Sequence, residues 1–379
     1  MVSRCAMPST FRALYVVAFL GSGIFTACTF ARAAWYNTPT LEAPGNFDSR
    51  KVRPTTMAVP LPVAPVEAAL AVPANLRDRY GTFDQLLSAN DTRAFLVVRD
   101  DIVVYERYFG RVTCDTLLPS FSISKTLAAL LVGCAVDDGL IASIQLPVTT
   151  FLPELAAREN YDQLRLEHLL RMVSGIDFEE ESYDSATLYY CAELHEPTLA
   201  FSITRTPGTY YRYGSVNIQM LWEVLHRSLR GRTVAQYFEE RVWRQLGTEH
   251  AATWSIDSQE SGIEKLFGGF NATARDFAKL GLLFLHEGTW RGTRVISPGW
   301  VAASLRADPV AGIQQTTDGR VRRGMYQWFL TLDGEAYFAK GYLGQYVWVD
   351  PARRTVIVRF GENHGSVDWL ALMRDIAGA

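Results

Sequence analysis

Residues 121–139 read FSISKTLAALLVGCAVDDG, in which a serine precedes a lysine by three positions at the start of an apolar run. Leu127, Leu130, Leu131 and Cys134 recur at helical spacing, which predicts a buried helix. Positions i and i+3 share one face of a helix, so the lysine amine can reach the serine hydroxyl. A serine hydroxyl needs such a base to act as a nucleophile, and a helix N-terminus stabilises developing negative charge. Because about one Ser-x-x-Lys is expected by chance in a chain this long, its surroundings decide its meaning.

Strand patterns lie on both sides of this region, and the region itself, from residue 122 to about 250, is mostly helical in pattern. The expected strands form three hairpins: 94–98 with 102–109, 328–332 with 336–339, and 346–349 with 355–360. Two further helices are expected at 274–287, capped by Asn271-Ala272-Thr273, and at 369–376. The pattern predicts an α+β fold, with one antiparallel sheet assembled from both ends of the chain, helices on its faces and an inserted all-α lobe. A cleft between sheet and lobe is the expected site.

Composition excludes several classes of protein. The chain has 379 residues, 48% of them hydrophobic, and a net charge of −3, which gives no basic surface for nucleic acid. Its six histidines are far apart in the sequence and show no metal-ligand spacing, so we expect neither a metal nor a cofactor. An ordinary globular enzyme is the remaining interpretation.

The first 33 residues have the layout of a secretory signal: basic residues, an apolar run, and the small-residue site Ala31-Arg32-Ala33. A lipoprotein signal ending before Cys28 and a retained membrane anchor are the alternatives. We therefore expect an exported protein, periplasmic or secreted, with a membrane contact only through this segment. Residues 34–74 are rich in proline and predict an extended arm or tether rather than a domain.

Three cysteines follow the predicted signal: Cys114, Cys134 and Cys191. An exported protein could pair two of them and leave one odd, but their spacing does not say which.

Further motifs follow residues 121–139 in order: HLLRMVSGI at 168–176, PGTYYRYGS at 207–215, VISPGW at 295–300 and GYLGQ at 341–345. With Ser-x-x-Lys, this ordered set resembles the serine β-lactamase-like superfamily of class C β-lactamases, family VIII esterases and DD-peptidases. Within it, the set is most similar to the 6-aminohexanoate-dimer (nylon-oligomer) hydrolases. The resemblance implies one hydrolase domain at 75–379, with sheet parts at about 75–115 and 262–379 and the helical lobe at about 122–255.

The resemblance also implies the roles of particular residues. Ser122 would be the nucleophile, Lys125 its base, and Tyr213 a proton relay, although Tyr210 and Tyr211 stand close by. The backbone N–H groups of Ser122 and Tyr342 would form an oxyanion hole.

Several residues would contact the substrate. The small Gly341 would allow it to approach the strand. Lys340, adjacent on that strand, would face the other side and is expected to be a solvent charge. On the helical lobe, Ser215, Ser182 and Tyr183 are the other candidates.

Residues 177–184 hold five carboxylates, which could attract a cationic substrate end or form a solvated loop. In nylon-oligomer hydrolases a tyrosine on this loop helps to hold the amide, and Ser182 stands at its position. This departure favours ester over amide hydrolysis.

The resulting hypothesis is a serine hydrolase that cleaves a small carboxylic ester or amide through an acyl-enzyme. The chain lacks Lys-Thr-Gly and Ser-Asp-Asn, which disfavours a lactamase, and lacks Gly-x-Ser-x-Gly, which disfavours an α/β-hydrolase. A penicillin-recognising enzyme acting on a lactam and a catalytically inactive binding protein remain as alternatives.

Overall fold

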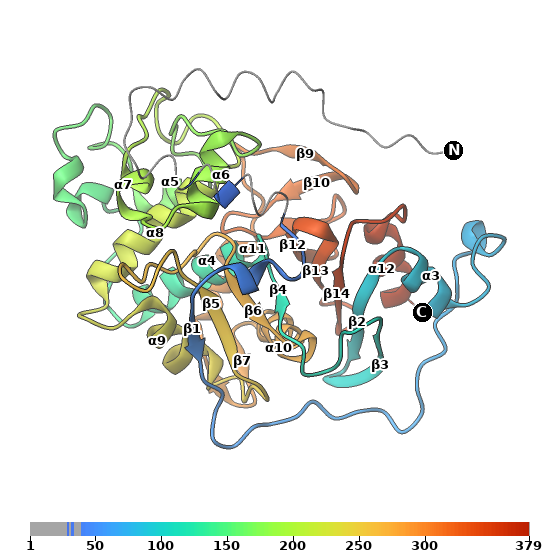
Figure 1. Ribbon diagram of the computed structural model, residues 1–379. Coiled ribbons are helices and arrows are strands. Elements are labelled where there is room, and N and C mark those ends of the chain that lie inside the picture. Colours follow the sequence, from blue (N-terminus) through green and yellow to red (C-terminus); the bar gives the residue numbers. More distant parts are fainter. Residues whose placement is uncertain (1–28, 30–31, 34–38, 379) are drawn as a thin grey trace.

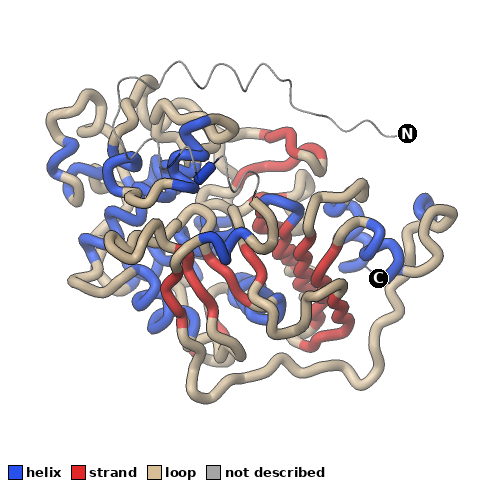
Figure 2. Tube along the Cα trace, in the orientation of Figure 1, coloured by secondary structure: helices blue, strands red, loops and turns tan. Residues whose placement is uncertain are grey.

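A computed structural model describes residues 29, 32–33 and 39–378 of the chain. Its centre is an antiparallel sheet of eight strands in the order β3-β2-β14-β13-β12-β11-β10-β9 (Figures 1 and 2). The strands are β2 (Thr92–Arg99), β3 (Ile102–Tyr108), β9 (Ile313–Thr316), β10 (Gly319–Arg323), β11 (Phe329–Leu330), β12 (Tyr337–Gly341), β13 (Gln345–Asp350) and β14 (Thr355–Gly361). The two ends of the chain meet where β2 pairs with β14, with Leu96 opposite Val358. The predicted α+β architecture is confirmed.

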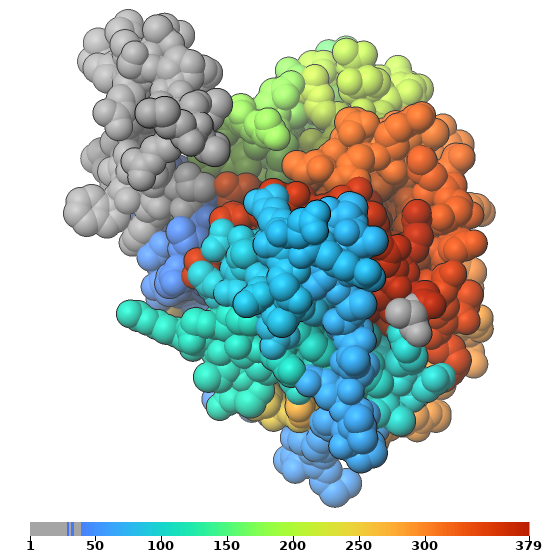
Figure 3. Space-filling model, turned by 90° about the vertical axis from the view of Figure 1, so that its right-hand side faces the viewer, coloured from blue at the N-terminus to red at the C-terminus, as the bar shows by residue number. Residues whose placement is uncertain are grey.

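Both faces of the sheet are covered, because successive apolar side chains along its strands point to opposite faces. Leu96 and Val358 belong to the core on one side, which includes α4 (Ile123–Asp137) and α10 (Ala274–Leu285). Phe95 and Ile357 belong to the core on the other side, formed with α3 (Phe83–Ala89) and α12 (Trp369–Gly378). Figure 3 shows this second side, where early residues in blue and cyan lie beside C-terminal residues in red. Such two-sided burial explains the near-continuous apolar runs of β2 and β14.

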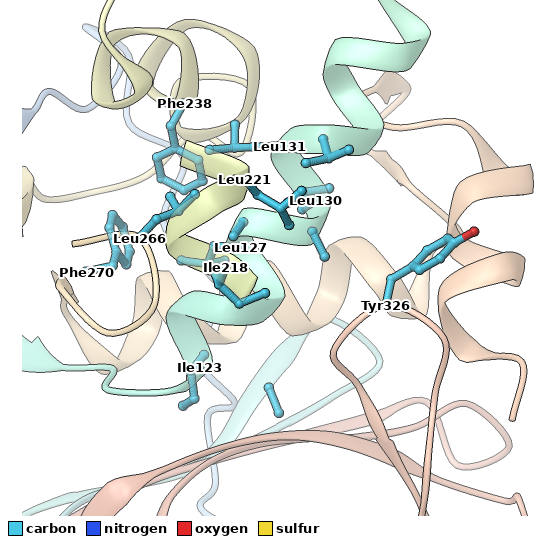
Figure 4. Packing of buried hydrophobic residues seen from close by; sticks show 14 of the residues in the cluster. Ile123, Leu127, Leu130, Leu131, Ile218, Leu221, Phe238, Leu266, Phe270 and Tyr326 are labelled. Carbon is cyan, nitrogen blue, oxygen red and sulfur yellow. The ribbon is translucent and has the colours of Figure 1, made fainter. Parts of the chain in front are cut away.

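Helix α4 connects the sheet to the helical lobe. Its residues 123–135 are all buried, and it packs on α8 (Ser215–Ser228). Figure 4 shows Leu127 and Leu130 of α4 beside Ile218 and Leu221 of α8. The helix that begins next to Ser122 is therefore the most enclosed in the core.

The remaining elements complete the lobe and the sheet flank. The lobe holds α5 (Leu166–Leu170), α6 (Tyr183–Tyr190), α7 (His195–Leu199), α9 (Val234–Phe238) and the π-helical turn Glu239–Trp243. Three short elements follow α10 in the chain: the strand pair β7 (Thr289–Trp290) and β8 (Thr293–Arg294), and then α11 (Pro298–Leu305). A second sheet, in the order β1-β5-β6-β4, consists of β1 (Ser49–Val52), β5 (Ala252–Ser255), β6 (Phe270–Ala272) and β4 (Leu118–Pro119).

The structure differs from the expectation in its strands. The main sheet takes six strands from the C-terminal region, not four, because β9 and β10 belong to it. Their sequence, IQQTTDGRVRR at 313–323, is mostly polar and gives no strand alternation, as befits an exposed sheet edge. The second sheet was not expected either, since its strands have only two to four residues. One of these strands, β5, lies at the C-terminal end of the region that the sequence analysis expected to be helical.

Most of the predicted leader, with Cys28, lies outside the described residues. Within the described part of the chain, no helix is long and apolar enough to cross a membrane. In the arm, residues 49–52 form β1 on β5, and Val63 bridges to Val103. Cys114, Cys134 and Cys191 are free thiols; the first is exposed and the other two are buried.

Candidate active site

The turn into α4 places Ser122 in an unusual backbone geometry. The preceding Phe121 has φ of +45°, a left-handed conformation that is strained for a non-glycine residue. The turn is tied to β6, because the Ser120 N–H donates to the Phe270 carbonyl at 2.9 Å and the Phe270 N–H donates to Ser124 Oγ at 3.0 Å. These bonds hold the strained turn, and Ser122 with it, in place.

Two functional groups converge on the Ser122 hydroxyl. Lys125 Nζ and Tyr213 OH each lie 2.9 Å from Ser122 Oγ. The lysine amine also donates to the Phe267 carbonyl at 3.0 Å and lies 5.1 Å from the centre of the Tyr213 ring. Lys125 is buried, so water has little access to this amine. The structure thus brings the three residues predicted for proton transfer into direct contact.

The neighbouring tyrosines are placed differently. Tyr210 is exposed and packs under Arg205, and Tyr211 lines the cavity described below. Among the described residues, Tyr213 is therefore the tyrosine whose hydroxyl bonds to the serine.

A cavity of about 690 Å³ opens at this triad. Its walls come from the helical lobe on one side and from β9, β11 and β12 on the other, which corresponds to the expected cleft. Eight of the lining residues are aromatic: Phe121, Tyr189, Tyr190, Tyr211, Tyr213, Phe267, Phe329 and Tyr342. The arrangement suits an apolar small molecule with a carbonyl group at Ser122.

Gly341 and Tyr342 lie at the end of β12, beside the nucleophile turn. A Cβ on Gly341 would collide with the Ser120 carbonyl, so the close approach that this glycine permits is that of the protein backbone. The Tyr342 ring packs edge-on against the Phe121 ring, with centroids 5.8 Å apart. Tyr342 and Ser122 both line the cavity, as expected of two residues whose N–H groups face one substrate oxygen.

A buried arginine that the sequence analysis did not single out supports this loop. Arg359 donates to the carbonyl of Gly344 at 2.6 Å and to that of Asn90 at 2.8 Å. Burial lowers the pKa of Arg359 to about 9. The sequence indicates that Arg359 is unusual in one way: it is a charged residue within the apolar strand 355–360.

The candidate substrate contacts on the lobe have local partners. The N–H and hydroxyl of Ser215 both donate to Glu180, at 2.7 and 2.6 Å. Ser182 caps α6, since its Oγ accepts from the Asp184 N–H at 3.1 Å. Both serines line the cavity, whereas Tyr183 is not among the lining residues.

Lys340 corrects the expectation of a solvent charge. Its ammonium group forms an ion pair with Asp318, whose side chain is fully buried. Asp318 also accepts from Tyr346 OH at 2.6 Å and bonds to His364 Nε2. Burial alone would raise the pKa of Asp318, but the bond to His364 and the charge of Lys340 hold it well below the usual value. Sequence reasoning missed this cluster because its members come from two strands, a turn and a loop that lie far apart in the chain.

The described residues contain no group of three or more His, Cys, Asp or Glu side chains arranged to hold a metal ion.

Comparisons with known proteins agree with the resemblance expected from the ordered motifs. The Beta-lactamase family model matches residues 83–368. The 6-aminohexanoate-dimer hydrolase of Paenarthrobacter ureafaciens is 30% identical over 320 residues, which cover 79% of each chain.

Solved structures are similar in fold. A Bacillus anthracis protein described as a 6-aminohexanoate-dimer hydrolase candidate superposes with a TM-score of 0.78 at 21% identity, covering 90% of this chain and 93% of its own. A family VIII carboxylesterase gives 0.61 at 19% identity, covering 81% and 98%. The resemblance expected from the ordered motifs is confirmed: the chain belongs to the β-lactamase family and is an enzyme of the serine-hydrolase type.

Proposed function

We propose that this enzyme hydrolyses carboxylic esters through an acyl-enzyme on Ser122. The observation that carries the proposal is the convergence of Lys125 Nζ and Tyr213 OH on Ser122 Oγ, each at 2.9 Å. A nucleophile within hydrogen-bond reach of its base is the geometry that acyl transfer needs.

In the acylation step, Ser122 Oγ forms a bond to the substrate carbonyl carbon and its proton passes to Lys125 Nζ. The N–H groups of Ser122 and Tyr342 donate to the oxyanion that develops. Tyr213 gives its phenolic proton to the alkoxide as the carbon–oxygen bond breaks, and regains a proton from Lys125. Water then attacks the acyl carbon and gives a proton to Tyr213 as Tyr213 passes its own phenolic proton to Lys125. Ser122 Oγ leaves the acyl carbon and takes that proton back from Lys125.

One observation favours an ester over an amide. Ser182, which stands where the resemblance places a substrate-binding tyrosine, uses its hydroxyl to cap α6.

Covalent labelling with a fluorophosphonate probe tests the proposal. The wild-type enzyme should carry the probe on Ser122 and hydrolyse a p-nitrophenyl ester. Ser122→Ala should lose the label, and its kcat should fall by about 10³-fold or more. Ser88→Ala, at an exposed serine of α3, is the matched control and should be labelled like the wild type.

The alternatives give different results in the same assay. Rapid opening of nitrocefin without ester turnover would identify a β-lactam substrate. Absence of both labelling and turnover would identify a binding protein with an inactive site.

A further inference from the structure

We propose that the cavity selects substrates whose acyl group is uncharged and discriminates against those that carry a carboxylate, because Asp318 neutralises Lys340, the one cation that the described residues place on its sheet wall. This inference rests on the ester hydrolysis proposed above and names the substrate class of the same site.

The cation concerned is Lys340. It lines the cavity from β12, directly before Gly341, and 16% of its side chain is exposed. At this position an unpaired ammonium group would attract a substrate carboxylate. Its Nζ is instead paired with the Asp318 carboxylate and bonded to Thr317 Oγ1.

Asp318 is held so that its charge persists. Its side chain is fully buried and is contacted by Lys340, His364 and Tyr346. It lies in the turn between β9 and β10, whose neighbouring residues Thr316 and Thr317 line the cavity. The same turn that forms the cavity rim therefore supplies the anion that cancels the Lys340 charge.

The other charges at the cavity do not replace this cation. Lys125 is bonded to Ser122 and to the Phe267 carbonyl. Glu180 and Glu181 line the opposite wall and supply carboxyl groups rather than a cation. Arg323 is buried 4.1 Å from the centre of the Phe329 ring and is not among the described lining residues. A carboxylate entering the cavity would lose its water without gaining an unpaired cation, which is costly.

Two substrates of equal length test the selection: p-nitrophenyl hexanoate and the mono-p-nitrophenyl ester of adipic acid. The acyl chain of the first ends in a methyl group, and that of the second ends in a carboxylate. For the wild type at neutral pH, kcat/KM for the neutral ester should exceed that for the anionic ester by about tenfold or more. Equal values would overturn the inference and leave ester hydrolysis standing, whereas turnover of neither ester would overturn the proposed function itself.

Two single variants and their combination locate the cause. Asp318→Asn keeps the shape of the side chain but releases the Lys340 charge, so the preference for the neutral ester should shrink by about three- to tenfold. Lys340→Met leaves the Asp318 charge without this cation, so the preference for the neutral ester should grow. The double variant removes both charges of a neutral pair and should return to the wild-type ratio.

The double variant decides the matter even where Asp318→Asn alone fails to fold, which the melting temperature and the neutral ester would reveal. A selective loss of anionic-ester hydrolysis in the double variant would mean that the Lys340 charge is available to substrates in the wild type, and the inference would be wrong. An unchanged ratio in a folded Asp318→Asn would contradict it equally.

Discussion

One hydroxyl oxygen is the meeting point of two distant pieces of chain. Ser122 Oγ accepts from Lys125, one helical turn away, and from Tyr213, which lies 91 positions further along. The first contact follows from helix geometry and the second from the packing of α8 against α4. The base is therefore fixed locally, while the proton relay depends on the fold.

At this scale we predict the effect of removing a single phenolic oxygen. Tyr213→Phe keeps the ring but loses the group that exchanges protons with the leaving alkoxide, so kcat on a p-nitrophenyl ester should fall by about 10²-fold or more. Tyr210→Phe, at an exposed ring outside the cavity, should retain wild-type kcat. Equal activity of the two variants would remove Tyr213 from the mechanism.

At the scale of elements, the site depends on how closely the end of β12 approaches the turn before α4. Gly341 permits this approach because its missing Cβ leaves room for the Ser120 carbonyl. The neighbouring Gly-x-x-Gly-Gln loop is tied to β14 as well, since Gln345 exchanges two hydrogen bonds with the backbone of Gly361, at 3.0 and 2.7 Å. The backbone at the end of β12 is thus held in direct contact with the backbone that leads into α4.

We predict that Gly341→Ala separates these two elements. The added methyl group meets a backbone oxygen that no rotamer change can move, so the free energy of unfolding should drop by about 1–3 kcal/mol. Ester hydrolysis should fall too, because the Tyr342 N–H moves away from the Ser122 N–H. Urea denaturation and kcat/KM measure the two effects.

The control for this variant is Gly299→Ala, where a Cβ would meet no atom within 4 Å. It should change neither stability nor activity appreciably. A Gly341→Ala protein as stable and active as this control would contradict the close packing of β12.

At the scale of the whole molecule, the core encloses a lysine whose amine makes no hydrogen bond. Lys265 is 1% exposed, and its Nζ has no hydrogen-bond partner. It lies 4.9 Å from the centre of the Phe47 ring, and burial lowers its pKa to about 8. Lys279 is buried as well, but its ammonium group donates to the Gly247 carbonyl at 2.8 Å and is paired with Glu249 and Asp276.

We predict that Lys265→Met stabilises the protein at neutral pH, by about 2 kcal/mol. Between pH of about 8 and 10.5 the unfolded chain holds the Lys265 proton and the folded chain releases it, so wild-type stability rises with pH there. The advantage of the variant should therefore shrink over this range, as thermal unfolding at a series of pH values would show. Lys279→Met should instead lose stability at neutral pH, because it leaves Asp276 and Glu249 without their cation. A constant or reversed difference for Lys265→Met would contradict the prediction.

Local features, which depend on residues close together in the chain, could be predicted from the amino-acid sequence. The Ser-x-x-Lys spacing, the buried helix that follows it and the β2–β3 hairpin could be predicted, because periodicity and turn residues act over a few positions. The paired Asp100 and Asp101, both with positive φ, form the turn that this hairpin requires. The order of the motifs was enough to indicate the family and hence the fold.

Which distant groups meet depended on the folded chain. The fold brought Tyr213, the tyrosine that the motif implied, to the Ser122 hydroxyl, joined the polar β9–β10 hairpin to the sheet, and paired Lys340 with Asp318. The last two have no local signal, because a polar edge strand resembles a loop in sequence and an ion pair leaves no periodicity. The physical reason is that such contacts arise when the sheet closes around the core and brings together residues far apart in the chain.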